Sequence, residues 1–129
     1  MKKILLDTNS YVAFKRNEPA AVRSIRQSEF IGINATVLGE LLSGFRAGSK
    51  EGANRKELNL FLESPRVQVL AIDEDTAEYY AKVFCDLKKK GRPIPTNDIW
   101  VAASAMQHGL WLVSKDEHFH EVEGLLLLV

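Results

Sequence analysis

The stretch Lys3-Ile4-Leu5-Leu6-Asp7-Thr8-Asn9 near the amino terminus decides the fold. Three consecutive apolar residues are typical of a strand that is buried on both faces, as strands are in a parallel sheet. Asp7 follows this run directly, and Thr8, Asn9 and Ser10 then offer side-chain oxygens that can cap a helix. A strand followed by a tight turn and a helix indicates an α/β fold, with Asp7 at the carboxyl end of the first strand.

Short apolar runs and longer segments of helical periodicity alternate along the rest of the chain, which predicts an α/β fold with a mainly parallel sheet. Four further strands are expected at 30–33, 67–72, 111–114 and 125–128. Helices are expected up to residue 14, at 19–28, 35–47 and 50–62, from 73 to the glycine at 91, and at 98–107. No repeat or linker interrupts the 129 residues, so we interpret residues 1–129 as a single domain.

The charge and cysteine content narrows the class of protein. Lys plus Arg and Asp plus Glu both number 17, which argues against a strongly basic nucleic-acid binder but leaves room for a local basic patch. Cys85 is the one cysteine, so no disulfide framework forms within the chain. Three apolar residues before Asp7 are too few for a signal peptide, and no apolar run approaches a membrane span. We therefore expect a cytoplasmic protein.

Four acidic residues occupy positions at which chemistry is expected. Asp7 and Asp116 follow the first and fourth predicted strands, and ligands of open α/β sheets bind beyond the carboxyl ends of strands. Asp98 begins an almost wholly apolar helix, whose start should lie inside the fold. Glu40 has no Lys or Arg at i±3 or i±4 to pair with it. Taken alone, Asp98 is better explained as a helix-dipole or cap residue, and Glu40 as part of a solvated helix face.

Convergence of these acids would require a cation. Two like charges about 4 Å apart repel by about 4 kcal/mol at an effective dielectric of 20. Several such pairs would rival the whole stability of a small domain, about 5–15 kcal/mol. Hard divalent cations such as Mg²⁺ prefer carboxylate oxygens and also bind substrate phosphate, which points to phosphodiester hydrolysis. Thr8, Asn9 and Ser114 are expected to orient a bound water or one of the carboxylates.

Four short motifs, each with one of the acids, follow one another across nearly the whole chain: Ile4-Leu5-Leu6-Asp7-Thr8-Asn9, Thr36-Val37-Leu38-Gly39-Glu40-Leu41, Asp98-Ile99-Trp100-Val101-Ala102-Ala103-Ser104-Ala105 and Leu112-Val113-Ser114-Lys115-Asp116-Glu117-His118-Phe119. In this order and chain length they resemble PIN-domain ribonucleases, and within them the VapC-type toxins of bacterial and archaeal toxin–antitoxin pairs. Ser114 departs from the Thr that the family often has, but it keeps the hydroxyl.

The resemblance has implications for fold, activity and partners. It implies a five-stranded parallel sheet flanked by helices in three layers, with Mg²⁺ or Mn²⁺ bound by Asp7, Glu40, Asp98 and Asp116. It implies endonucleolytic cleavage of RNA, usually a structured RNA such as tRNA or rRNA, and inhibition of translation until a cognate antitoxin blocks the site. Such toxins are commonly homodimers. We expect the antitoxin segment on the apolar surface of the helices at 35–62.

Two other features have plainer interpretations. The densest basic run is a candidate for phosphate contact, although a solvated helix end explains it better. The run consists of Lys88, Lys89, Lys90 and Arg92. His118 and His120 lack the helical spacing of a zinc pair, so a surface or packing role is expected for both.

Three alternative functions stay open at the level of the sequence. A phosphoryl-transfer enzyme of the haloacid-dehalogenase type needs Asp-x-Asp where this chain has Asp7-Thr8-Asn9, and a receiver domain built on Asp73 leaves Glu40 and Asp98 unexplained. A non-catalytic binding module would use the acids as caps and surface charges, and Mn²⁺ binding that is lost in Asp98→Asn would argue against it. A housekeeping RNA-processing PIN nuclease differs from a toxin in its genomic neighbour.

Overall fold

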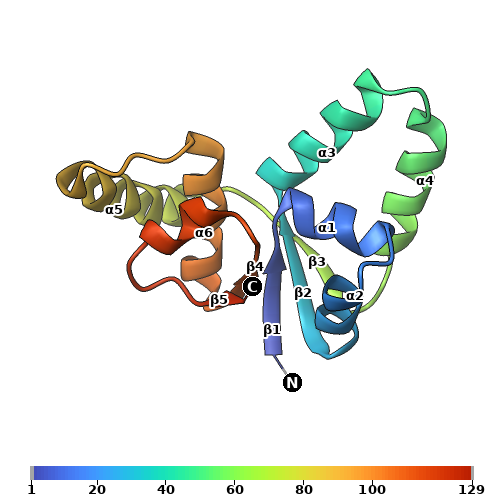
Figure 1. Cartoon of the computed structure of the whole chain (residues 1–129), viewed down its shortest axis with the longest axis horizontal. Helices are drawn as coiled ribbons and strands as arrows, with labels where there is room; N and C mark the ends of the chain where they lie inside the picture. Colours follow the sequence, from blue (N-terminus) through green and yellow to red (C-terminus); the bar gives the residue numbers. More distant parts are fainter. Residues whose placement is uncertain (1, 129) are drawn as a thin grey trace.

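A five-stranded parallel sheet forms the centre of the structure, a computed structural model that describes residues 2–128. In chain order the strands are β1 (Lys2–Leu6), β2 (Ser28–Asn34), β3 (Val67–Leu70), β4 (Trp111–Val113) and β5 (Leu127–Leu128). In space they follow the order β3-β2-β1-β4-β5, and every neighbouring pair is parallel (Figure 1). The chain therefore adds β2 and β3 on one side of β1, and then adds β4 and β5 on the other side of β1.

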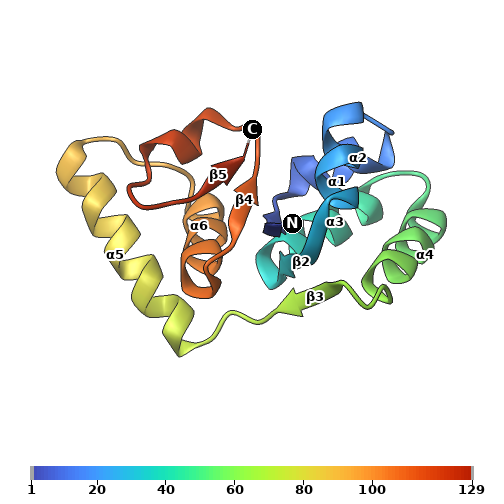
Figure 2. The same ribbon diagram turned by 90° about the horizontal axis from the view of Figure 1, so that it is seen from below.

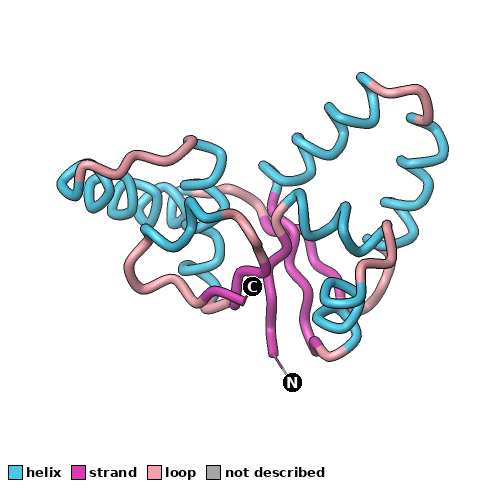
Figure 3. Tube along the Cα trace, viewed as in Figure 1, coloured by secondary structure: helices cyan, strands magenta, loops and turns pink. Residues whose placement is uncertain are grey.

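Helices flank this sheet on both sides (Figure 3). The helices are α1 (Thr8–Lys15), α2 (Pro19–Arg26), α3 (Ala35–Ala47), α4 (Glu51–Leu62), α5 (Glu74–Lys90) and α6 (Thr96–His108), with a short 3-10 helix η1 (Glu117–Glu121). Figures 1 and 2 place α5, α6 and η1 beside β4 and β5, and α1 to α4 beside β2 and β3. The predicted fold class, an α/β protein with a five-stranded parallel sheet, is confirmed.

The apolar run of β1 is buried on both faces, as its composition predicts. Ile4, Leu5 and Leu6 are at most 1% exposed. Leu5 packs into a core cluster with residues of α3, α5 and α6, whereas Ile4 and Leu6 pack against Ile25 of α2 on the opposite face. Burying each such side chain stabilises the fold by about 1.5–3 kcal/mol, so β1 holds the two layers of helices onto one sheet.

Helix α6 is buried along most of its length because of its small apolar side chains. Ala102, Ala103 and Ala105 are at most 1% exposed, which lets the helix axis approach its neighbours closely. The left-handed Gly109, with a φ of 63°, ends the helix. Between residues 2 and 128, no helix combines the length and the apolar character needed to cross a membrane.

Several element ends differ from those that the sequence predicts. Asp7 itself caps α1, because its side chain accepts the backbone N–H of Ser10, so the polar residues after Asp7 are not the caps. Helix α6 begins two residues early at Thr96, directly after Pro95. Strand β3 ends at Leu70 instead of 72, because its last partner in β2 is Asn34. Strand length is set here by the neighbouring strand as well as by local composition.

Candidate functional site

The candidate site lies at the carboxyl edge of the sheet, where the strand order reverses. Strands β1 and β4 are parallel neighbours, and Leu6 pairs with Val113 at their carboxyl ends. Asp7 follows β1 directly, and Asp116 follows β4 after two residues. This reversal point is where ligands of open α/β sheets bind, because the loops leaving β1 and β4 diverge there and open a crevice.

Asp7 is the most buried of the four predicted site acids. The residue is 7% exposed, and its two carboxylate oxygens accept different hydrogen bonds. Oδ1 accepts the backbone N–H of Ser10 at 2.8 Å, and Oδ2 accepts the hydroxyl of Ser114 at 2.5 Å. Both donors fix the direction in which the remaining lone pairs of the carboxylate point. The side chain of Asp7 is therefore held in a fixed orientation at the end of the central strand.

Ser114 connects the loops after β1 and β4. Its side chain is buried, and its Oγ donates to Asp7 while it accepts the backbone N–H of Asp116 at 3.0 Å. One hydroxyl thus sets the position of two acids that are distant in sequence. The prediction that Ser114 orients a carboxylate agrees with this geometry, and a threonine at this position offers the same hydroxyl.

Replacing Ser114 gives a direct measure of this connection. If Asp7 is a metal ligand, Ser114→Ala should weaken Mn²⁺ affinity by about 10–100-fold, the usual effect of losing a residue that orients such a ligand. The fold should survive, with about 1–3 kcal/mol lost because Asp7 and the Asp116 N–H each lose a buried partner. Calorimetric titration with Mn²⁺ measures the affinity. Ser114→Thr should retain wild-type affinity, and equal weakening in both variants would contradict the role of the hydroxyl.

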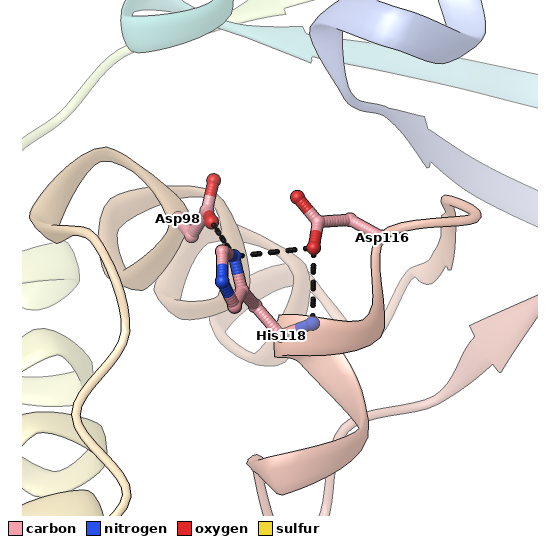
Figure 4. Close-up of side chains that lie close together, drawn as sticks. All are labelled: Asp98, Asp116 and His118. Atoms are coloured by element: carbon pink, nitrogen blue, oxygen red, sulfur yellow. Dashed lines mark hydrogen bonds and ion pairs between the residues drawn. The ribbon is translucent and has the colours of Figure 1, made fainter.

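Asp98, Asp116 and His118 form a second group of polar side chains, which we call the Asp98–Asp116–His118 cluster (Figure 4). His118 Nδ1 lies 3.1 Å from Asp98 Oδ2 and 3.1 Å from Asp116 Oδ1. Asp98 stands in the first turn of α6, whereas Asp116 caps η1 by accepting the backbone N–H of His118 at 3.0 Å. Helix α6 and the η1 turn thus bring the two carboxylates together.

His118 is the residue that sequence reasoning missed. The sequence predicts a surface or packing role; the side chain is indeed exposed, and its ring also lies beside the carboxylates of two predicted site acids. The helical spacing of a zinc pair is the wrong criterion here, because η1 is a 3-10 turn and the partner Asp98 comes from another helix. The Asp-x-His spacing of Asp116 and His118 was the available signal. His120, two residues further, is exposed.

Glu40 projects from the middle of α3 and is exposed. The hydroxyl of Thr8 donates to Glu40 Oε1 at 2.7 Å, so the residue next to Asp7 orients it. The negative charge of Glu40 is the smallest of the effects that raise the pKa of Asp98, and Glu40 is not one of the residues whose ligand atoms gather around Asp98 and Asp116. Asn9 is exposed and, with Ser114 and Lys115, lines a cavity of about 230 Å³ beside α1 and α2.

The pKa of Asp98 is raised above its ordinary value. Burial is the largest cause, because it disfavours the charged carboxylate, and the charges of Asp116 and Glu40 act in the same direction. The hydrogen bond from His118 opposes these effects. The site is thus short of positive charge, and a bound cation would supply it. Carboxylate oxygens gathered at one edge, with a raised pKa, are a donor set that fits a hard divalent cation.

The basic run lies apart from the acids. Lys88, Lys89 and Lys90 end α5 at its outer end, from which the loop with Arg92 returns to the start of α6 (Figures 1 and 2). Lys90 Nζ donates to the backbone carbonyl of Glu121 at 2.7 Å and lies 3.4 Å from its carboxylate. The ammonium group of Lys90 is therefore already engaged within the protein.

An all-parallel sheet with carboxylates gathered at its strand ends is an arrangement that suits metal-dependent hydrolysis of phosphodiesters. The PIN domain family model matches residues 4–125. The tRNA(fMet)-specific endonuclease VapC of Shigella flexneri is 30% identical over 129 residues, which cover 97% of this chain and 96% of that protein. The chain belongs to the PIN-domain family and, within it, to the VapC-type ribonucleases.

Further relatives agree with this assignment. Ribonuclease VapC1 of Haemophilus influenzae (strain R2866) is 30% identical over 127 residues, covering 94% of this chain and 92% of that one. A chain of the DNA-bound VapBC structure from Salmonella typhimurium superposes with a TM-score of 0.86 at 25% identity, covering 99% of this chain and 98% of its own. PIN nucleases are divalent-metal dependent, and this chain carries an acidic cluster at the expected edge of the sheet.

Proposed function

We propose that this protein is a divalent-metal-dependent endoribonuclease, the toxin of a toxin–antitoxin pair, whose site consists of Asp7, Glu40, Asp98 and Asp116. The observation that carries the proposal is the meeting of Asp98 and Asp116 at the carboxyl edge of the sheet, where Ser114 bonds both the backbone of Asp116 and the carboxylate of Asp7. Family membership supplies the expectation of nuclease chemistry. Mg²⁺ or Mn²⁺ is the proposed cofactor.

The residues of the site take different parts in this proposal. Asp98 and Asp116, whose carboxylates lie close together, would hold the cation with Asp7 as a further ligand, and Glu40 would complete the acidic edge with its orientation set by Thr8. When bound, a divalent cation lowers the pKa of an attacking water and stabilises the leaving oxygen of a phosphodiester. Ser114 fixes the position of Asp7 relative to the loop of Asp116 through two hydrogen bonds, so that the carboxylates would need little rearrangement when a cation binds.

The proposed substrate is a structured RNA, tRNA or rRNA. The relative from Shigella flexneri carries the name tRNA(fMet)-specific endonuclease, which supports a tRNA as the first substrate to examine. Cleavage of such RNA would inhibit translation and would take place in the cytoplasm. A homodimer stays a prediction from family membership.

We propose a cognate antitoxin as the protein partner, because solved structures similar to this chain are VapBC complexes. Helices α3 and α4 extend away from the sheet beside α1 (Figure 1). A cavity of about 350 Å³ between these helices is lined by Tyr11, Val12 and Phe45 among others, and Leu60 of α4 is 63% exposed. Protection of α3 and α4 from hydrogen exchange by co-purified antitoxin would support this placement, and protection of another face would contradict it.

The test of the proposed function is to sequence the RNA ends produced in cells that express the protein. New 5′ ends at defined positions in structured RNA, absent from cells that express Asp98→Asn, are expected. No difference between wild type and variant would overturn the proposal. A small open reading frame that abuts or overlaps the gene would separate a toxin from a housekeeping RNA-processing nuclease.

The basic run gives a separate prediction about RNA binding. Neutralising Lys88, Lys89 and Arg92 to Gln should weaken binding and lower the slope of log affinity against log salt by about 0.7 for each lost phosphate contact. Salt titrations of a catalytically inactive protein measure this slope. Arg23→Gln with Arg26→Gln is the matched control, since α2 carries these exposed charges toward the opposite edge of the sheet. An unchanged slope would exclude phosphate contact.

A further inference from the structure

The imidazole of His118 contacts two of the carboxylates that are proposed to bind the cation, those of Asp98 and Asp116. Figure 4 shows the ring beside both acids, and its Nδ1 lies 3.1 Å from one oxygen of each. The side chain is 49% exposed, and those of Asp98 and Asp116 are 21% and 32% exposed. A hydrated ion from solution can therefore reach all three groups, so the Asp98–Asp116–His118 cluster is an accessible set of one nitrogen and two oxygens.

We propose that His118 Nδ1 is a direct ligand of the divalent cation held by Asp98 and Asp116, and that this nitrogen gives the site a preference for Mn²⁺ over Mg²⁺. The inference rests on the proposed function, in which the two acids bind the cation. It adds a ligand that is not an acid and a consequence for the choice of metal.

The distances within the cluster suit a shared cation. Adjacent ligands of an octahedral ion that are each about 2.1 Å from the metal lie about 3.0 Å from one another. The two separations of 3.1 Å between Nδ1 and the carboxylate oxygens match this spacing. The ligand atoms of all three residues also lie within 4.8 Å of one another. A cation bound between these three ligand atoms would need only small side-chain movements.

The turn that carries His118 holds its ligand atoms in place. Asp116 accepts the backbone N–H of His118 and donates its own N–H to Ser114, which in turn is bonded to Asp7. Asp116 and His118 are therefore fixed relative to each other within one 3-10 turn and relative to the end of β1. Preorganised ligands of this kind lose little conformational entropy when a metal binds.

The choice of metal follows from the nitrogen ligand. Mg²⁺ favours carboxylate and water oxygens and dehydrates reluctantly, whereas imidazole is a better ligand for transition metals. A site of oxygens alone would discriminate less against Mg²⁺. If His118 instead acted as a hydrogen-bond donor that positions the carboxylates, its nitrogen would not touch the ion.

Pulsed electron paramagnetic resonance of Mn²⁺ bound to the full chain distinguishes a ligand from a positioning residue. Wild-type protein and the control His120→Gln should show nitrogen coupling from a bound imidazole, and His118→Gln should not. Labelling histidine with ¹⁵N in the wild-type protein should change the coupling, which tests the assignment without a substitution. Calorimetry should show Mn²⁺ affinity reduced by about tenfold or more in His118→Gln, with Mg²⁺ affinity changed less than about threefold.

Each outcome supports or overturns the inference. Mn²⁺ binding and RNA cleavage without nitrogen coupling would overturn the role of His118 and leave the proposed function intact. Coupling that persists in His118→Gln, or equal losses for the two metals, would also overturn it. No Mn²⁺ binding by the wild-type protein would overturn the inference and the proposed function together.

Discussion

Asp98→Asn is expected to reduce RNA cleavage by about a thousandfold or more while the protein stays folded. Asparagine keeps the shape of the side chain but removes the charge that Asp98 would offer a cation beside Asp116. A thousandfold loss corresponds to about 4 kcal/mol of transition-state stabilisation, within the range of a metal-ion contribution. Initial rates on a cleavable RNA measure the effect. Glu78→Gln, an exposed acid of α5, is the control and should cleave at the wild-type rate.

The same substitution should stabilise the metal-free protein at about pH 7. The pKa of Asp98 is raised, so its folded state favours the protonated acid. The stability contributed by this group is complete below the unfolded pKa of 3.8 and is lost as the pH rises through the folded value. Asparagine does not ionise, so the Asp98→Asn variant does not lose this stability as the pH rises.

The melting temperature of Asp98→Asn should therefore exceed that of wild type by a few degrees, about 2–8 °C for each kcal/mol in a domain of this size. The difference should shrink as the pH falls toward the unfolded pKa. Added Mn²⁺ should reverse the order, because it binds and stabilises only the wild-type site. Thermal melts across pH, with and without metal, measure this. A lower melting temperature for the metal-free variant at neutral pH would contradict the electrostatic account.

Asn34→Ala is expected to have the largest effect on stability, about 2–4 kcal/mol. Asn34 is fully buried where β2 meets α3. Its Oδ1 caps α3 by accepting the N–H of Val37 at 2.9 Å, and its Nδ2 donates to Ser104 Oγ at 3.1 Å in α6. Alanine leaves these partners buried without a hydrogen bond. Because small domains have only about 5–15 kcal/mol of stability, a large share would be lost.

Urea denaturation measures the change in the free energy of unfolding for Asn34→Ala. Asn59→Ala on the exposed face of α4 is the matched control and should change stability by less than about 0.5 kcal/mol. Cleavage should also fall, because Asn34 connects the helix of Glu40 to the helix of Asp98. Equal stability of the two variants would show that these buried hydrogen bonds contribute little to the fold.

The sequence by itself determined the parallel fold and the positions of Asp7 and Asp98 at the ends of their secondary-structure elements. An apolar run from Ile4 to Leu6 can be buried on both faces only within a covered sheet, and an acid directly after it must lie at the carboxyl edge. The nearly uniform apolar character of α6 likewise predicts that Asp98 starts a buried helix. These inferences depend on local composition and periodicity, which the chain displays without any long-range contact.

Only the tertiary structure decided which side chains meet. Ser114 reaches Asp7 across 107 positions because β1 and β4 are paired, and no periodicity predicts that register. His118 joins Asp98 because the η1 turn lies against the start of α6, and Lys90 is held by Glu121 for a similar reason. Contacts of this kind depend on how separate elements dock, so a side chain read as surface in the sequence becomes part of the site.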